Sequence, residues 1–251
     1  MNVCVVGTGF TGLVTSVCLA HIGHKVICVD EDGARVSQLQ SGMSLITEPS
    51  MESMMQKSIQ AGRLSFTTEL GAGMAHGDII FVSVSNRLSS SDMGDRNTAK
   101  VVGRSMATHL ARMPHTYKVI VNQLSSPVQS GNWLRQILLD EMSRPQIKQS
   151  SPQDFVIIVK NFSVVVNPVF LRKGFAINDM ICPDQIILGS NSKRAISKMK
   201  DLYQPLIAHR GVKDEARVPV SFIVTDLMSV HLKEPAHLKQ PETMWPIMQI
   251  V

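Results

Sequence analysis

The segment VCVVGTGFTGL, residues 3–13, constrains the fold of this 251-residue chain more than any other stretch. Its first four residues are apolar and lead into a glycine, a pattern typical of a buried strand. Residues 10–23 then place apolar side chains at helical spacing and end in a glycine, which predicts a helix. Residues 25–30, KVICVD, predict a second buried strand. Strand, glycine turn, helix and strand form one βαβ unit, whose right-handed crossover makes the two strands parallel.

The same alternation of strands and helices continues along the chain. It predicts an α/β fold, with a Rossmann-type doubly wound, mostly parallel sheet and helices on both faces. Further strands are predicted at 78–84, 117–122, 155–159, 163–167, 185–189 and 218–226. Further helices are predicted at 33–41, 50–61, 97–112, 130–142 and 192–203. A polar loop that contains two prolines is expected near 143–154.

Three prolines interrupt the last part of the chain, at Pro235, Pro241 and Pro246. A proline inside a helix costs about 3 kcal/mol or more, so no long straight helix is expected after about residue 233. We therefore expect one large domain over residues 1–225 and a proline-broken tail over residues 226–251.

Composition limits the classes of partner. The formal net charge is +5, but the lysines and arginines are scattered, which favours a solvated surface over nucleic-acid binding. The four cysteines lack metal-ligand and disulfide spacing, which indicates buried free thiols in a reducing compartment: Cys4, Cys18, Cys28 and Cys182. Residues 1–24 have neither the basic start of a signal peptide nor the unbroken apolar run of a membrane span. We expect a cytoplasmic protein that binds no metal, nucleic acid or membrane.

Three glycines, Gly7, Gly9 and Gly12, follow the pattern G-x-G-x-x-G at the first turn. The first glycine permits a tight turn, the second lets a pyrophosphate approach the backbone, and the third lets helix and strand pack closely. The helix N-terminus adds free N–H groups and a positive dipole end. Asp30 ends the next strand about 20 residues further on, where a carboxylate can accept both ribose hydroxyls and favour NAD over NADP. The alternatives are a purely structural turn, and an Arg35 that meets a 2′-phosphate.

Longer stretches resemble the UDP-glucose 6-dehydrogenase family of nucleotide-sugar dehydrogenases, and they run in the order of that family. In the first half they are GTGFTGLVTSVCLAHIGHKVICVD at 7–30, EP at 48–49, AGRLSFTTEL at 61–70 and AHGDIIFVSV at 75–84. In the second half they are YKVIVN at 117–122, NPVFLRKGFAINDMICPDQIILG at 167–189, LYQPL at 202–206 and VTDLMS at 224–229. The resemblance implies an N-terminal NAD domain, which a central dimer helix and a UDP-sugar domain follow in the family.

The resemblance also implies an activity and a set of site residues. Members of the family oxidise the C6 hydroxyl of UDP-glucose to a carboxylate with two NAD+, through a covalent intermediate on a C-terminal cysteine. Together with the glycine turn, it implies NAD contacts from Gly7, Gly9, Phe10, Thr11, Gly12, Asp30, Arg35, Val84, Ser85 and Ser125. Phe10 and Thr11 would supply turn N–H groups, and Val84 and Ser85 would line the adenine and pyrophosphate side. Ser125 would line the nicotinamide side, and it is the one retained catalytic candidate, where the family has a threonine.

Several positions depart from the family pattern. Val169 stands where the family has its functional glutamate, and Lys173 stands at its second acid. Gln123 replaces a lysine. The family's catalytic lysine falls on Glu234 and its asparagine on Leu238. The nucleophile stretch of the C-terminal domain has no counterpart, and none of the four cysteines replaces it.

Three hypotheses follow. The leading one is an NAD-binding domain of a nucleotide-sugar dehydrogenase homologue, truncated and degenerate, without dehydrogenase activity by itself. The second is one half of a split or complemented UDP-glucose 6-dehydrogenase, with a separate chain that supplies the substrate domain. The third is a regulatory or interaction protein, whose apolar tail MWPIMQIV meets a hetero-partner. In each case we expect the family dimer to be lost and UDP-sugar binding to need a C-terminal domain.

Overall fold

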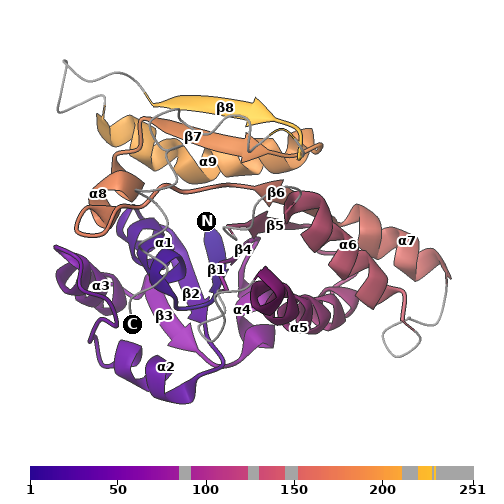
Figure 1. Cartoon of the computed structure of the whole chain (residues 1–251), viewed down its shortest axis with the longest axis horizontal. Coiled ribbons are helices and arrows are strands. Elements are labelled where there is room, and N and C mark those ends of the chain that lie inside the picture. Colours follow the sequence, from indigo (N-terminus) through magenta and orange to yellow (C-terminus); the bar gives the residue numbers. More distant parts are fainter. Residues whose placement is uncertain (85–91, 124–129, 145–151, 211–219, 228, 230–251) are drawn as a thin grey trace.

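The computed structural model describes residues 1–84, 92–123, 130–144, 152–210, 220–227 and 229. Within these ranges the chain forms an α/β structure around one sheet (Figure 1). The strands are β1 (Asn2–Val6), β2 (Lys25–Val29), β3 (Leu64–Thr67), β4 (Ile79–Val82), β5 (Lys118–Asn122), β6 (Phe162–Val166), β7 (Gln185–Gly189) and β8 (Ser221–Thr225). The helices are α1 (Phe10–His21), α2 (Gly33–Gln40), α3 (Met51–Gln60), α4 (Leu70–His76), α5 (Asp92–Ala111), α6 (Ser130–Met142), α7 (Pro152–Lys160), α8 (Ala176–Ile181) and α9 (Lys193–Arg210).

The strand order in the sheet is β3-β2-β1-β4-β5-β6-β7-β8. Strands β1 to β6 run parallel, while β7 and β8 are parallel to each other and antiparallel to β6. The order reverses between β1 and β4, which makes the carboxyl edge of these two strands the switch point where doubly wound sheets bind ligands. The predicted Rossmann-type fold is confirmed.

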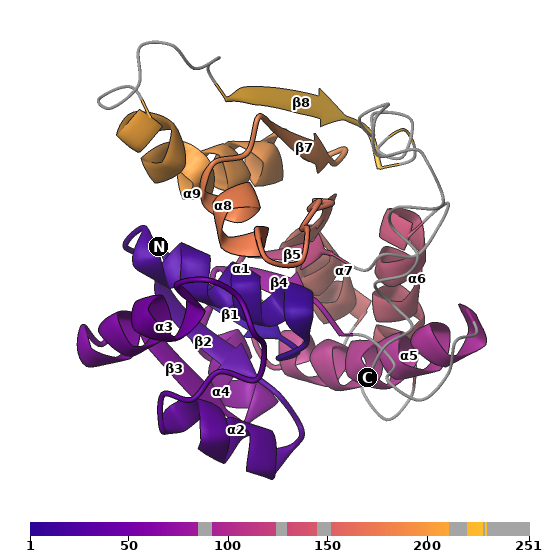
Figure 2. The same ribbon diagram turned by 60° about the vertical axis from the view of Figure 1, so that its left-hand side comes forward.

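Alternate residues of the central strands are buried on opposite faces of the sheet. Val3 and Val5 of β1 belong to one core cluster, which packs against α1, α3, α8 and α9. Cys4 and Val6 belong to the other cluster, which packs against α4, α5, α6 and α7. Helices on both faces explain why the strands are apolar on both faces instead of alternating. Figures 1 and 2 both show α8 between α1 and α9, so α8 is one of the elements that connect the β7–α9–β8 unit to the first half of the chain.

The prediction of a strand at 155–159 is wrong. This segment, FVIIV, lies inside helix α7, which begins at Pro152, so residues 152–154 are helical too instead of part of a loop. A short apolar run does not distinguish a buried strand from a buried helix, and proline is well suited to the first helical position. The prediction also omitted β3, α4 and α8.

The other predicted helices and strands are close to the observed ones. The helix predicted at 130–142 coincides with α6, and the strand predicted at 218–226 contains the shorter β8. Pro235, Pro241, Pro246, Glu234 and Leu238 lie outside the described residues, as does most of the predicted tail.

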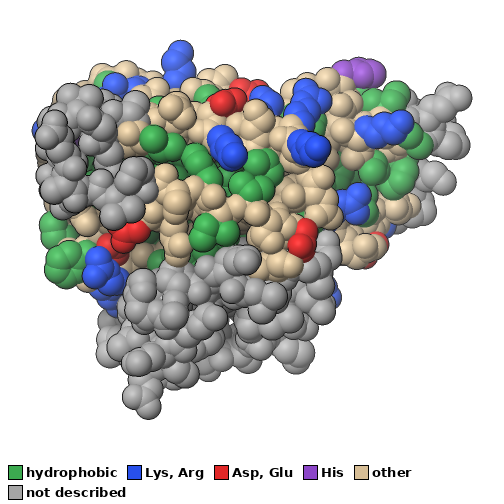
Figure 3. Space-filling view, turned by 90° about the horizontal axis from the view of Figure 1, so that it is seen from above, with side chains coloured by type: hydrophobic (Ala, Val, Ile, Leu, Met, Phe, Trp, Pro, Cys, Tyr) green, Lys and Arg blue, Asp and Glu red, His purple; other side chains and the backbone are tan. Residues whose placement is uncertain are grey.

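All four cysteines lie in described segments and are free thiols. Cys4, Cys18 and Cys28 are buried, and burial raises the pKa of each of these thiols, that of Cys28 to about 12. They are therefore packing residues rather than nucleophiles. No described helix has the length and apolar character that a membrane crossing requires. Lysine and arginine side chains are spread over the face in Figure 3 instead of gathering in one cluster.

His24 joins the first βαβ unit to helix α9. The ring is 5% exposed; its Nε2 donates to the carbonyl oxygen of Leu202 at 2.8 Å, and its Nδ1 lies 3.2 Å from the nitrogen of Met1. Burial lowers the pKa of His24, as does the charge of the Met1 amino group, while the bond to Leu202 opposes the shift in part. The neutral imidazole is therefore the form that stabilises the fold.

We predict that His24 makes the fold less stable in mild acid. Because its folded-state pKa lies below the unfolded value of about 6.5, the unfolded state binds the proton more readily as pH falls through that value. Each pKa unit of difference removes about 1.4 kcal/mol once the pH is below both values. Urea unfolding between pH 7.5 and 5 should show a shallower loss of stability for His24→Gln than for the parent. His115→Gln, a change at an exposed histidine, should keep the parental slope, and equal slopes for all three proteins would contradict the prediction.

Candidate functional site

The glycine turn between β1 and α1 has a backbone that accepts no side chain at its first position. Gly7 has φ of +105°, a conformation that favours glycine, and its N–H donates to the carbonyl oxygen of Val29 at 2.7 Å. A Cβ on Gly7 would lie 2.7 Å from the carbonyl oxygen of Ser83, at the end of β4. The turn is therefore pressed against the neighbouring strand, at the point where the strand order reverses.

The third glycine is still more confined. A Cβ on Gly12 would lie 2.1 Å from the carbonyl oxygen of Gly7 and 3.2 Å from the Cβ of Ser83. Only glycine lets the first turn of α1 approach the end of β1 this closely.

The N-terminus of α1 is open to an anion. Gly9 is the N-cap, and the first helical hydrogen bond runs from the N–H of Leu13 to the carbonyl oxygen of Gly9, at 2.9 Å. The N–H groups of Phe10, Thr11 and Gly12 precede this bond, so no helical carbonyl satisfies them. The first turn carries no acidic residue. Free donors and the positive end of the helix dipole are the combination that binds phosphate groups.

Asp30, which follows β2, is held by hydrogen bonds from the turn. Its Oδ2 accepts from the N–H of Thr8 at 2.8 Å and from the Thr8 hydroxyl at 2.5 Å, and its Oδ1 accepts from the N–H of Asp32 at 3.1 Å. Burial by itself would raise the pKa of this carboxyl. The three hydrogen bonds and the charge of Arg35 outweigh burial and hold that pKa below its usual range. The group is an oriented carboxylate at neutral pH, with lone pairs left for ribose hydroxyls.

Arg35, in the first turn of α2, reaches back over the glycine turn. Its Nη2 donates to the carbonyl oxygen of Thr8 at 2.7 Å, and its Nε donates to the Thr8 hydroxyl oxygen at 3.1 Å. The same Nε lies 3.8 Å from Oδ2 of Asp30, and the side chains of Arg35 and Asp30 are 14% and 16% exposed. The structure thus brings both predicted side chains together through Thr8, a residue that the sequence analysis did not single out.

The ends of β4 and β5 complete the described part of this edge. The Ser83 hydroxyl donates to Oε1 of Gln123 at 2.6 Å, and the Thr15 hydroxyl of α1 donates to the same oxygen at 3.3 Å. Val84 is half-buried, and its nitrogen would lie 3.2 Å from a Cβ on Gly7. Ser85 and Ser125 lie outside the described residues, so the structure does not place these two predicted contacts. Gln123 is the residue that replaces a family lysine, and Ser83 lies in the family-like stretch at 75–84, but the sequence analysis assigned neither of them a contact at this edge.

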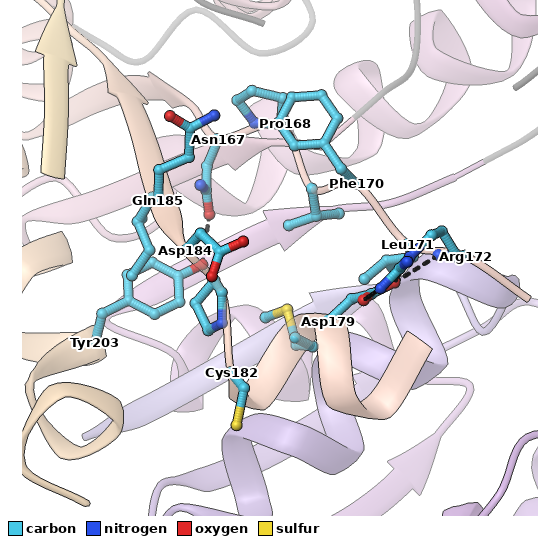
Figure 4. A pocket seen from close by; sticks show the side chains of 14 residues that line it. Asn167, Pro168, Phe170, Leu171, Arg172, Asp179, Cys182, Asp184, Gln185 and Tyr203 are labelled. Atoms are coloured by element: carbon cyan, nitrogen blue, oxygen red, sulfur yellow. Dashed lines mark hydrogen bonds and ion pairs between the residues drawn. The ribbon is translucent and has the colours of Figure 1, made fainter. Parts of the chain in front are cut away.

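A second feature is a pocket of about 470 Å³, which is lined by the segment after β6, by α8, by the start of β7 and by α9 (Figure 4). Tyr203 donates to Oδ1 of Asn167 at 2.5 Å, and Nδ2 of Asn167 donates to the carbonyl oxygen of Ile187 at 3.0 Å. Arg172 binds Asp179 through two nitrogens, at 2.6 and 3.2 Å. Asn167, Tyr203, Arg172 and Asp179 of this pocket are thus paired with protein groups.

The segment after β6 carries the two substitutions noted in the sequence. Val169 lines the pocket and packs against the core, and Lys173 is exposed. Glu48, 8% exposed, anchors the segment from the first half of the chain, because its carboxylate accepts from the N–H of Gly174 at 2.7 Å and of Ala176 at 3.1 Å. In the parts of the chain that the structure describes, no group of three or more His, Cys, Asp or Glu could hold a metal ion.

A profile of the UDP-glucose/GDP-mannose dehydrogenase family, NAD binding domain, matches residues 1–207. The chain belongs to this family. It carries the family's NAD-binding domain, which supports NAD as its cofactor.

Two curated relatives illustrate how much of the family the chain covers. UDP-glucose 6-dehydrogenase TuaD of Bacillus subtilis is 32% identical over 207 residues, which make up 82% of this chain and 41% of the relative. A UDP-glucose 6-dehydrogenase of Rhizobium meliloti is 32% identical over 213 residues, which make up 84% of this chain and 45% of the relative. The chain therefore spans less than half the length of these relatives.

Solved structures of dehydrogenases share the fold. A GDP-mannose dehydrogenase from Pseudomonas aeruginosa has a TM-score of 0.75 at 23% identity, and a UDP-glucose dehydrogenase from Pyrobaculum islandicum has a TM-score of 0.74 at 24% identity. In both cases the match covers 92% of this chain and 48% of the solved chain.

We predict that Gly12→Ala disrupts both packing and cofactor binding. A methyl group 2.1 Å from the Gly7 carbonyl oxygen must displace the start of α1, which should cost about 1–3 kcal/mol of stability. The displaced amides should weaken NADH binding by about tenfold or more in a fluorescence titration. Gly33→Ala is the control, because a Cβ there meets no atom within 4 Å. Parental NADH affinity in Gly12→Ala would contradict the close approach.

Proposed function

We propose that residues 1–225 act as an NAD-binding domain in which the cofactor lies across the carboxyl edge of β2, β1 and β4. The observation that supports this proposal most strongly is the tightly packed turn of Gly7 and Gly12. It places the free N–H groups of α1 at the switch point of the sheet, beside the oriented carboxylate of Asp30. The amides of Phe10 and Thr11 bind the pyrophosphate, and Asp30 accepts the hydroxyls of the adenosine ribose. Val84 and Ser85 line the adenine and pyrophosphate side, and Ser125 lines the nicotinamide side.

We predict that Asp30→Asn weakens NADH binding by about ten- to hundredfold, because hydrogen bonds to a charged group contribute about 1.5–3 kcal/mol. Isothermal titration of the purified chain with NADH measures the loss. Glu31→Gln is the matched control, since it removes the same charge from the exposed residue next to Asp30. A parent chain that binds no NADH at millimolar concentration would contradict the proposed function itself.

We further propose that this chain does not oxidise a nucleotide sugar by itself. The argument rests on the segment after β6, where the resemblance implies two acids and the chain has Val169 and Lys173. An alkyl side chain that packs in the core neither takes a proton nor orients water, and an exposed ammonium reverses the charge at the second position. The cofactor edge needs neither residue, so binding and chemistry separate in this chain.

We predict that the chain with NAD+ and UDP-glucose gives no NADH absorbance above the rate without protein. A UDP-glucose 6-dehydrogenase assayed in the same buffer is the positive control. NADH titration of the same sample shows whether an inactive preparation still binds the cofactor. Turnover that depends on UDP-glucose would contradict the proposed lack of activity and leave the proposed NAD binding intact.

A second candidate function is one half of a two-chain dehydrogenase. The observation that favours it is that residues 1–207 match the NAD-binding domain of the family, while Val169 and Lys173 stand at the positions where the resemblance implies acids. A separate polypeptide would then supply the substrate domain and act as the hetero-partner. Mixing the chain with the product of any neighbouring reading frame that encodes such a domain tests this function. NADH formation in the mixture supports it, and inactivity of every such mixture rejects it.

A further inference from the structure

Thr8 connects the two charged side chains of the proposed ribose site, Asp30 and Arg35. It stands between the first two glycines of the turn, it is 0% exposed, and it comes 22 residues before Asp30 and 27 before Arg35. Its hydroxyl donates to Oδ2 of Asp30 and accepts from Nε of Arg35. One oxygen atom therefore bridges an anion and a cation whose own closest distance is 3.8 Å.

The bridge decides where the guanidinium of Arg35 lies. Thr8 engages Nε through its hydroxyl and Nη2 through its carbonyl oxygen, so the planar group is held at two points across the turn. An arginine near the strand-end acid is the group that would otherwise meet a 2′-phosphate. Held at two points, the group is not free to swing to such a phosphate.

The bridge also decides how Asp30 presents its charge. The Thr8 hydroxyl and amide occupy the same oxygen, Oδ2, so that Oδ1 is left with one bond from the N–H of Asp32. An ionised carboxylate with open lone pairs attracts ribose hydroxyls and repels a 2′-phosphate that would lie beside it. The held position of Arg35 and the ionised Asp30 carboxylate both favour NAD over NADP.

We propose that the Thr8 hydroxyl sets the preference for NAD over NADP, as a positioning residue that holds Arg35 across the turn and fixes the Asp30 carboxylate. The inference rests on the proposed function, because it concerns how the same site selects its dinucleotide. It assigns part of the selection to a buried neutral side chain, in addition to the Asp30 carboxylate that the proposed function places at the ribose hydroxyls.

Thr8→Val tests the inference, because it removes the hydroxyl and keeps the shape of the side chain. NADH binding should weaken and NADPH binding should strengthen, so that the ratio of the two dissociation constants changes by about tenfold toward NADPH, as expected for one hydrogen bond to a charged group. Thr8→Ser, which restores the hydroxyl, should keep the parental ratio. In the double variant Thr8→Val/Arg35→Met the gain in NADPH binding should disappear, since it depends on a guanidinium that has lost one of its two contacts with Thr8.

Thr108→Val on α5 is the matched control, because it removes a hydroxyl that bonds only locally, to the carbonyl oxygen of Arg104. The ratio of its dissociation constants for NADH and NADPH should equal that of the parent. Equal weakening of NADH and NADPH in Thr8→Val would overturn the inference, because it would show a purely structural role. So would a parental ratio in Thr8→Val. A parent chain that binds neither dinucleotide overturns the proposed function as well, which separates the two failures.

Discussion

The contact between the first turn of α1 and the end of β1 is the constraint on which the cofactor edge depends. Gly7 and Gly12 leave no room for a Cβ, and each is also pressed against Ser83 of the neighbouring strand. This packing fixes three things together: the direction of α1, the position of its free amides, and the spacing between β1 and β4. Most of these contacts are to backbone atoms, namely the carbonyl oxygens of Ser83 and Gly7.

Electrostatics at this edge are settled by hydrogen bonds more than by ion pairing. Arg35 and Asp30 are nearly buried yet stay 3.8 Å apart, with Thr8 between them. A direct ion pair would occupy lone pairs of the carboxylate with the guanidinium, whereas the bridged arrangement places both Thr8 hydrogen bonds on Oδ2 and leaves Oδ1 with one bond from the N–H of Asp32. At the ends of β4 and β5, Oε1 of Gln123 accepts from two hydroxyls, while its buried Nε2 has no hydrogen-bond partner among the residues that the structure describes. Imperfect satisfaction of this kind concentrates where proteins bind ligands.

The sequence predicted the parts of the fold that depend on local pattern. The first βαβ unit, the glycine turn and the helix at 130–142 follow from periodicity and turn chemistry. Helix α4, LGAGMAH, could not be predicted this way, because two glycines in seven residues disfavour a helix. Tertiary packing explains one of these glycines, since a Cβ on Gly73 would collide with the side chains of Val29 and Cys4. The prediction for residues 155–159 was wrong for a different reason, since an apolar run of this length suits a buried strand as well as a buried helix. Asp30 and Arg35 were predictable, but their bridge through Thr8 depends on contacts across more than 20 residues that no local pattern encodes.

Binding and catalysis place different demands on such a domain, and this explains how a chain can retain one without the other. In the proposed site, backbone amides, glycines and a single carboxylate bind the dinucleotide, so the proposed binding depends on few side chains. Oxidation of a sugar needs particular acids and bases at the next site along the sheet, where one substitution removes a function without unfolding the protein. Val169 illustrates this, because it joins the apolar core on the segment that Glu48 anchors. The exchange of an acid for an alkyl group is thus compatible with the fold, which is why the proposed loss of chemistry carries no penalty in cofactor binding.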